Sequence, residues 1–246
     1  MTDRIPLLTR LDLRLKRPLV RLYNAILRFI PFSIKYRLGS RLRRRIHPYR
    51  NLGTGDTVVL IGSARDILLA GRSRAMHSAM IVGPSGRIIV LEADPGSCAA
   101  LRDYAHKHRV SQITVIGKGA WRSCGRLRFL TNPRHPAANR LAGFVTAGVK
   151  KDDFEGIEID VDSIDNILRD NRIDGPIRLV SVTTNGSELD VLKGLGETAR
   201  RCDYISVARA YRTPDVGEKL LAMGFSEVAI DDRGILFRRQ DLVLGA

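Results

Sequence analysis

The residue of this chain with the clearest chemical potential is Glu92, which ends an apolar run at positions 88–91. The stretch from Val82 to Tyr104 predicts a turn, a buried strand that ends in Glu92, and a helix that opens just after Pro95. An acidic residue at the end of the second strand of an α/β sheet is where such folds bind a ribose. The alternative is a plain solvated strand end, and this stretch alone favours neither.

The elements that must position Glu92 alternate regularly from Thr57 onward. We expect strands at 57–61, 87–91, 113–116, 157–161, 177–182, 204–208, 227–230 and 235–238, with an added strand at 126–130. We expect the helices between them at 64–80, 96–108, 163–171, 187–201 and 215–223. Strands separated by helices of about 10 to 15 residues predict an α/β fold with a parallel, doubly wound sheet. The last two strands have no helix between them, which predicts an antiparallel hairpin at one edge.

Ligands of such a sheet lie across the carboxyl ends of its first strands. Here the corresponding loops begin at Gly62, Glu92, Gly117 and Thr183. A dinucleotide-binding protein should carry Gly-x-Gly-x-x-Gly after the first strand, whereas this chain has the single Gly62 there. NAD is therefore disfavoured. The segment 131–156 has no clear period and predicts a long loop, of the kind that forms lids or binding loops.

Composition narrows the class of protein further. At 246 residues and 44% hydrophobic, the chain can form one large α/β domain. Cys98, Cys124 and Cys202 are far apart and form no CxxC pair, which favours reduced thiols in a cytosolic setting and predicts no zinc site. No apolar run is long enough to span a bilayer, and arginines interrupt every apolar run near the N-terminus, so we expect neither a membrane span nor a signal peptide.

Positive charge is concentrated at the start of the chain. Residues 1–50 hold 14 Lys and Arg against two Asp, whereas the remainder holds 27 basic and 24 acidic residues. We therefore divide the chain into a basic amphipathic helical extension, 1–50, and a domain, 51–246. Two apolar stripes at helical spacing run through the extension, and they consist of Leu19, Leu22, Tyr23, Ile26, Leu27 and Ile30 in the first and Ile34, Leu38, Leu42 and Ile46 in the second.

Several surfaces suit such an extension. Basic amphipathic helices bind anionic membranes, and the same helices can instead pack on the domain or on a second subunit. Nucleic acid is a third partner, since phosphate contacts need little beyond clustered charge, but the aromatic residues here follow the apolar stripes. An organelle transit peptide is disfavoured because the extension contains only two serines, Ser33 and Ser40.

Several short motifs, taken in order, resemble the FkbM-type methyltransferases. They are Gly-Pro-Ser-Gly-Arg at 83–87, Leu-Glu-Ala-Asp-Pro at 91–95, Gly-Lys-Gly-Ala-Trp at 117–121, Ile-Glu-Ile-Asp-Val-Asp-Ser-Ile-Asp-Asn-Ile-Leu at 157–168, Asn-Gly-Ser-Glu at 185–188 and Leu-Lys-Gly at 192–194. The resemblance covers about residues 54 to 239. Each motif is weak alone, and their order and spacing make the resemblance specific.

The resemblance implies a class I, Rossmann-like fold with a seven-stranded sheet and S-adenosylmethionine as cofactor. It implies methyl transfer to a hydroxyl group of a glycan or a small-molecule natural product, and the basic extension adds a lipid-linked molecule as a possible acceptor. The residues expected to bind the cofactor are Gly62, Ser63, Glu92, Ala93, Lys118, Gly119 and Thr183. A cytoplasmic protein, peripheral on the inner membrane face through residues 1–50, would suit a membrane-borne acceptor.

The chain departs from the family pattern at two places. The family's first motif, Asp-x-Gly-Ala-Asn-x-Gly, has Leu60 in place of the aspartate, Ala64 in place of the asparagine and Asp66 in place of the second glycine. After the fourth strand, Thr183 replaces a leading acid. A carboxylate near the cofactor favours its positive charge, so these changes leave open a non-catalytic binding or scaffold protein with the same fold.

Two residues are candidates for the general base that an alcohol acceptor requires. His135 lies in the long loop with Asn139 and Arg140, and Glu188 lies at the start of a predicted helix. The simpler interpretations are a solvated loop histidine and a helix-start acid stabilised by the helix dipole. We also interpret Trp121 as core packing, and the neighbouring acids Asp160, Asp162 and Asp165 as a strand end and a helix start, so no metal site is predicted.

Overall fold

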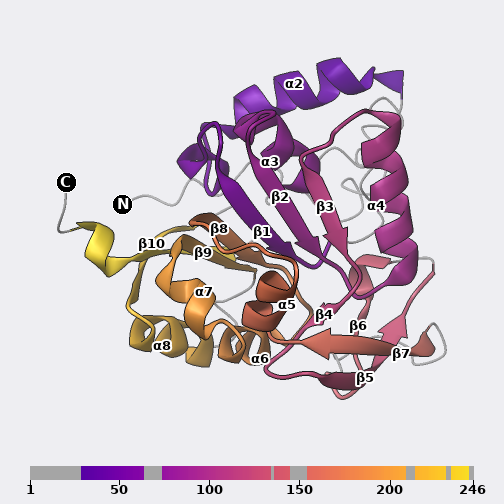
Figure 1. Ribbon diagram of the computed structural model, residues 1–246, viewed down its shortest axis with the longest axis vertical. Helices are drawn as coiled ribbons and strands as arrows, with labels where there is room; N and C mark the ends of the chain where they lie inside the picture. The colour runs from indigo at the N-terminus through magenta and orange to yellow at the C-terminus, as the bar shows by residue number, and fades with distance from the viewer. Residues whose placement is uncertain are drawn as a thin grey trace, which may run out of the picture.

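A seven-stranded sheet forms the centre of the molecule in the computed structural model (Figure 1). The structure describes residues 29–63, 74–133, 136–144, 154–208, 214–230 and 234–243. From edge to edge its strands are β10 (Phe225–Ile230), β11 (Gly234–Arg239), β9 (Cys202–Ala208), β8 (Ile177–Val182), β1 (Thr57–Ile61), β2 (Arg87–Leu91) and β3 (Ile113–Ile116). The pairs from β9 to β3 are parallel, and β11 runs antiparallel to both of its neighbours. The predicted Rossmann-like fold with its antiparallel edge hairpin is confirmed.

Helices cover both faces of this sheet because its central strands are apolar on both sides. On one face lie α2 (Phe32–Arg43), α3 (Arg74–Val82) and α4 (Pro95–Lys107), and on the other α5 (Ile164–Asp170), α6 (Glu188–Lys193), α7 (Gly196–Arg200) and α8 (Pro214–Ala222). Strand β1 shows the alternation, because Leu60 packs with the first group and Ile61 with the second. Short 3-10 turns span Tyr49–Asn51, Pro136–Ala138 and Gln240–Val243.

A second, four-stranded sheet lies beside the main one, at the lower right of Figure 1. Its order is β4 (Gly119–Ala120), β7 (Glu155–Asp162), β5 (Gly125–Thr131) and β6 (Arg140–Leu141). The sequence predicted strand 157–161 as part of the main sheet, and this is wrong: β7 pairs antiparallel with β5. Its alternating burial explains why, since only one side of β7 is covered.

The predicted helix at 187–201 is two helices, α6 and α7, that meet at Gly194. A Cβ atom at Gly194 would lie 2.1 Å from the Trp121 carbonyl oxygen, so the chain turns here where only glycine fits. Asp165 stabilises the first turn of α7, because its two carboxylate oxygens accept hydrogen bonds from the backbone amides of Glu197 and Thr198 at 2.9 and 2.8 Å. The sequence of 187–201 has a continuous helical period, so the pattern did not predict the break at Gly194. The contact with Trp121, far away in the sequence, requires that break.

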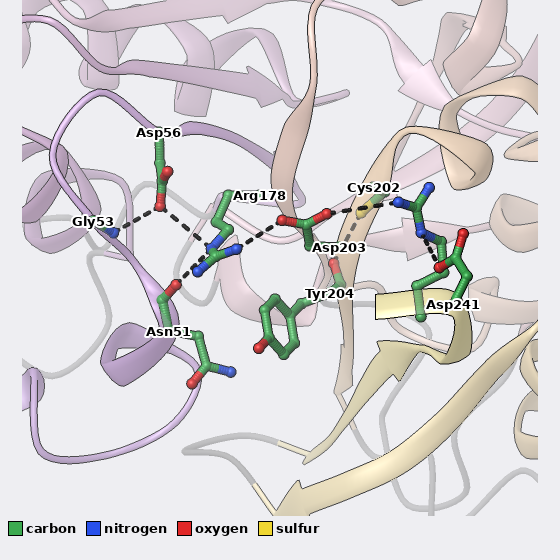
Figure 2. Close-up of polar contacts among 9 residues, drawn as sticks. Asn51, Gly53, Asp56, Arg178, Cys202, Asp203, Tyr204 and Asp241 are labelled. Carbon is green, nitrogen blue, oxygen red and sulfur yellow. Dashed lines mark hydrogen bonds and ion pairs between the residues drawn. The ribbon is translucent and has the colours of Figure 1, made fainter. Parts of the chain in front are cut away.

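A polar network at the amino-terminal ends of the strands joins β8 and β9 to the segment before β1 (Figure 2). Arg178 donates to the Asn51 carbonyl at 2.8 Å and to the Asp203 carboxylate at 2.7 Å. Its guanidinium also lies 3.6 Å from Asp56, which accepts a hydrogen bond from the Gly53 amide. The network fixes the end of the sheet that is opposite the loops after β1, β2 and β8.

Some predictions fall outside the described residues, among them most of the helix at 64–80, Ala64, Asp66, His135 and nearly all of the first apolar stripe. Within the described ranges, no helix combines the length and the apolar character needed to cross a membrane. The same ranges contain no group of three or more acidic, histidine or cysteine side chains able to hold a metal ion. Cys98 and Cys202 are buried free thiols, and Cys124 is an exposed one.

Candidate functional site

A cavity of about 620 Å³ opens at the carboxyl ends of β1, β2 and β8. This is the edge of a doubly wound sheet where ligands bind, and the volume is within the range of pockets that hold a cofactor-sized molecule. The main sheet supplies one wall through Ile61, Leu91 and Ala208, and the loops that follow the strands supply the polar groups.

Glu92 is the acidic residue of the cavity wall within the described residues. Its side chain is only 7% exposed, and its two oxygens accept hydrogen bonds from the Ser63 amide at 2.5 Å and the Asp94 amide at 2.9 Å. Burial raises the pKa of Glu92, and the amides of Asp94 and Ser63 oppose that rise. A carboxylate oxygen accepts more than one hydrogen bond, so Glu92 can still accept from hydroxyl groups of a ligand.

The turn after Glu92 is built by local capping. Asp94 is the N-cap of α4 and accepts hydrogen bonds from the amides of Gly96 and Ser97, both at 3.1 Å. Pro95 occupies the first turn of the helix, where a missing N–H costs nothing. The sequence Glu-Ala-Asp-Pro therefore ends β2, starts α4 and directs the Glu92 carboxylate toward β1.

Gly62 makes the close approach between β1 and β8 possible. Its φ is +79°, a left-handed conformation, and a Cβ atom there would lie 2.2 Å from the Thr183 carbonyl oxygen. Gly62 also donates to the Leu91 carbonyl at 2.9 Å, and Thr183 donates to the Ile61 carbonyl at 2.8 Å. The three strand ends are thus joined at one point, which leaves the Ser63 amide directed at Glu92.

The second sheet forms the opposite wall of the cavity. Phe129 of β5, Leu141 of β6, and Ile159 and Val161 of β7 line it, and all four belong to one hydrophobic cluster. Gly119 of β4 lies against this cluster, with Val161 2.9 Å from the position of a Cβ atom. The cavity is therefore enclosed between two sheets, and an apolar face is available to an aromatic base.

The loop at 136–139 closes a third side and is held by Asn185. The Asn185 amide nitrogen donates to the Ala137 carbonyl at 3.0 Å and to the Asn139 carbonyl at 2.8 Å. Asn139 in turn accepts a hydrogen bond from the Asn132 amide at 2.7 Å. Asn185 therefore connects the end of β8 to the loop, which fixes this side of the cavity.

Thr184 provides a polar group that nothing in the described part of the chain satisfies. Its hydroxyl oxygen is buried and has no hydrogen-bond partner among the described residues, and Thr184 lines the cavity. An unsatisfied buried hydroxyl costs stability, so such a group in a pocket wall is well suited to pair with a ligand.

Two arginines also line the cavity and give it positive charge. Arg140 is buried, with its guanidinium 4.4 Å from the centre of the Phe154 ring. Arg43 belongs to the last turn of α2 and lies over Tyr49 at 5.2 Å. Glu92 lines the same cavity, so the cavity can accommodate a ligand that carries groups of both signs.

The cavity brings together six of the seven residues predicted for cofactor binding, namely Gly62, Ser63, Glu92, Ala93, Gly119 and Thr183. Lys118 does not line it, and its ammonium group lies 3.8 Å from Asp162 instead. Glu188 also lies outside the lining, buried against the Gly186 amide at 3.2 Å. Trp121 packs edge-on against Phe144.

Sequence reasoning missed the wall that the second sheet provides. Phe129, Leu141, Ile159 and Val161 have the apolar alternation of any half-buried strand, and nothing in their types indicates a binding surface. Thr184 was also missed, although it follows Thr183 directly. The sequence placed Asn139 and Arg140 beside His135 in the long loop and Asn185 in the Asn-Gly-Ser-Glu motif, but it assigned none of the three to the site.

Leu60, the most conspicuous departure from the first motif, points away from the cavity. It is buried in the hydrophobic cluster on the α3 side of the sheet, whereas Ile61 and Gly62 line the site. The leucine therefore replaces no group in the cavity wall of this structure.

The chain is similar to known proteins in sequence and in fold. The family model described as methyltransferase FkbM domain matches residues 61–226. Fibrillarin from Aeropyrum pernix, solved with natively bound S-adenosyl-L-methionine, is 16% identical, with 82% of this chain and 72% of that chain covered and a TM-score of 0.44. Methyltransferase FkbM from Methylobacillus flagellatus KT is also 16% identical, with 90% and 58% covered and a TM-score of 0.49, so the chain spans 58% of its length. No curated protein sequence matches.

Because the family model covers more than half of the chain, this protein belongs to the methyltransferase FkbM domain family.

Proposed function

We propose that this protein is an S-adenosylmethionine-dependent methyltransferase that methylates a hydroxyl group of a glycan, lipid-linked or natural-product acceptor. The observation that carries the proposal is Glu92, a buried carboxylate held by two backbone amides at the ligand-binding edge of a methyltransferase-family sheet. A carboxylate at the end of the second strand is suited to accept hydrogen bonds from both ribose hydroxyls.

The residues of the cavity fit this cofactor. Glu92 would hold the ribose, the Gly62–Ser63 turn would face the amino-acid part, and Ala93 and Gly119 would lie beside the adenine against the apolar second sheet. Bound S-adenosylmethionine supplies an electrophilic methyl group on a sulfonium centre. The chain contributes a preformed cavity that would orient the acceptor oxygen, which is a major source of acceleration in such displacements.

The acceptor would bind on the side formed by Thr184, Asn185 and the loop at 136–139. The unsatisfied Thr184 hydroxyl can donate to an acceptor oxygen, and Arg140 can hold a negatively charged group. A base for the acceptor hydroxyl must reach this side of the cavity. Of the two bases predicted from the sequence, Glu188 does not line the cavity and His135 lies outside the described residues; we propose His135 as the base.

This assignment predicts separable effects of His135→Ala. Methyl transfer should fall by about a hundredfold or more, since general base catalysis contributes about that much, while the Kd for S-adenosylhomocysteine stays unchanged. Release of S-adenosylhomocysteine measures transfer, and calorimetry measures binding. An unchanged turnover number would assign the proton transfer to another group.

The function itself is tested by screening hydroxyl-bearing glycans, lipid-linked sugars and small alcohols for acceptor-dependent formation of S-adenosylhomocysteine, with mass spectrometry to locate the added methyl group. Glu92→Gln should suppress formation with every acceptor. Tight cofactor binding without transfer to any acceptor class, or methylation of nitrogen only, would contradict the proposed reaction. Absence of cofactor binding would instead support a scaffold protein that kept only the fold.

A further inference from the structure

Helix α2 is fixed to the domain by one face. Tyr36 and Ser40 are buried, the Ser40 hydroxyl lies 3.3 Å from the His77 ring nitrogen, and Phe32 stacks on His108 with ring centres 4.0 Å apart. A Cβ atom at Gly39 would lie 2.7 Å from the His77 ring, so the helix backbone lies directly on α3. The orientation of α2 is therefore set, and its other face points away from the domain (Figure 1).

That outer face is apolar. Of the eight large hydrophobic side chains that are exposed in the described residues, five lie in and around α2, namely Phe29, Ile34, Leu38, Leu42 and Ile46. Within the helix the spacing of four places Ile34, Leu38 and Leu42 in one row. Exposed apolar groups that gather in this way mark a binding surface rather than ordinary surface scatter.

The segment that carries the row has basic residues and no acidic ones. Arg37, Arg41 and Arg45 are exposed next to the row, and residues 29–50 contain seven Lys and Arg without a single Asp or Glu. None of these three arginines forms an ion pair or side-chain hydrogen bond with the described part of the chain. A protein partner would need both a hydrophobic groove and a continuous acidic rim. An anionic bilayer supplies an apolar interior for the leucine and isoleucine side chains and headgroup phosphates for the arginines.

We propose that the outer face of α2 docks this protein on an anionic membrane surface. Ile34, Leu38 and Leu42 insert between the lipid headgroups, and Arg37, Arg41 and Arg45 contact the phosphates. The helix lies in the plane of the interface, because its inner face stays on α3. Arg43, in the last turn of α2, lines the cavity, so docking brings the cavity near the bilayer. This surface is independent of the proposed methyl transfer.

The test is co-sedimentation of the full chain with vesicles of phosphatidylcholine containing about a third phosphatidylglycerol, compared with pure phosphatidylcholine. We expect binding to the anionic vesicles that weakens as salt rises. Leu38→Glu should reduce that binding at least about tenfold, because it removes an inserted side chain and adds a repelled charge. Leu221→Glu is the matched control: both leucines are 55% exposed, and Leu221 lies on α8. It should leave binding unchanged.

Charge is tested with a second pair of variants. The triple change of Arg37, Arg41 and Arg45 to Gln should weaken binding by about a hundredfold, whereas the same change at the exposed residues Arg87, Lys107 and Arg200 should have a small effect. Circular dichroism melts establish that each variant is folded.

Three outcomes would overturn the proposal. The first is vesicle binding that Leu38→Glu leaves intact, which would assign docking to another segment. The second is absence of vesicle binding together with a change of oligomeric state in Leu38→Glu, which would make the face a contact between copies or with residues 1–28. The third is absence of vesicle binding with tight binding of single-stranded RNA that depends on the arginines but not on Leu38, because phosphate contacts need no apolar insertion.

Discussion

Two buried polar groups in the site differ in whether the chain supplies them with hydrogen-bond partners. Each Glu92 oxygen accepts one backbone hydrogen bond and can accept more, while the Thr184 hydroxyl has no partner in the described residues. The sequence indicated Glu92 because a carboxylate after four apolar residues is unusual. It gave no sign of Thr184, since burial without a partner is a property of the folded arrangement.

Burial of Glu92 predicts the pH dependence of cofactor binding. Its pKa is raised above the ordinary value of 4.5 by desolvation, and only the ionised carboxylate accepts hydrogen bonds with both oxygens. Affinity for S-adenosylhomocysteine should therefore be full above the raised pKa and decline as the pH falls through it, at a higher pH than an ordinary glutamate would give. Calorimetry between about pH 5 and 8 measures this. Glu92→Gln should bind weakly with a flat profile, and an equally steep profile in that variant would assign the titration elsewhere.

The change Thr184→Val tests the unsatisfied hydroxyl. Valine has nearly the same shape, so the melting temperature should stay the same or rise slightly once an unpaired buried polar group is removed. Binding of the ligand that pairs with the hydroxyl should weaken by about 0.5–1.5 kcal/mol. Thermal melts and titrations with cofactor and acceptor measure the two effects. A lower melting temperature with unchanged binding of both ligands would show that the hydroxyl supports the fold instead.

At the scale of elements, the site is made where the ends of β1, β2 and β8 meet. Each strand was predictable as a short apolar run, and the parallel order followed from the helices between them. The second sheet was not predictable in the same way, because β6 is only two residues long and β5 pairs antiparallel with β7 across a segment that has no clear period. The break between α6 and α7 was hidden for a similar reason: Gly194 is required by Trp121, which is remote in sequence.

Gly62→Ala tests the meeting point of the strands. The new Cβ atom would lie 2.2 Å from the Thr183 carbonyl oxygen at a positive φ, so we expect a loss of about 1–3 kcal/mol of stability and a large loss of cofactor affinity. Gly217→Ala in α8 is the control, since a Cβ atom there has no neighbour within 4 Å. Replacing glycine by alanine within a helix should raise the free energy of unfolding by about 0.5–1 kcal/mol. Denaturant titrations measure the stability of both variants. Equal changes in stability for Gly62→Ala and Gly217→Ala would contradict the role given to Gly62.

At the scale of the whole molecule, the two ends of the main sheet have different tasks. The network around Arg178 fixes the amino-terminal ends of the strands, and the cavity occupies the carboxyl ends between the two sheets (Figures 1 and 2). The alternation of elements in the sequence predicted the strands of the main sheet and the edge at which ligands bind, although it also placed the strand at 157–161 in that sheet, where it does not lie. The enclosure of the cavity depends on packing of β5 and β7 against that edge, which no local pattern encodes.

The central claim is that this cavity binds S-adenosylmethionine through Glu92. Isothermal calorimetry of the full chain with S-adenosylhomocysteine tests it most directly, using Glu92→Gln and, as a matched control, Glu188→Gln. Both glutamates are buried, at 7% and 5% exposure, and both accept backbone hydrogen bonds, but only Glu92 lines the cavity. We predict micromolar binding that falls at least about tenfold in Glu92→Gln and persists in Glu188→Gln. Absence of binding up to millimolar ligand, or equal binding by both variants, would contradict the account.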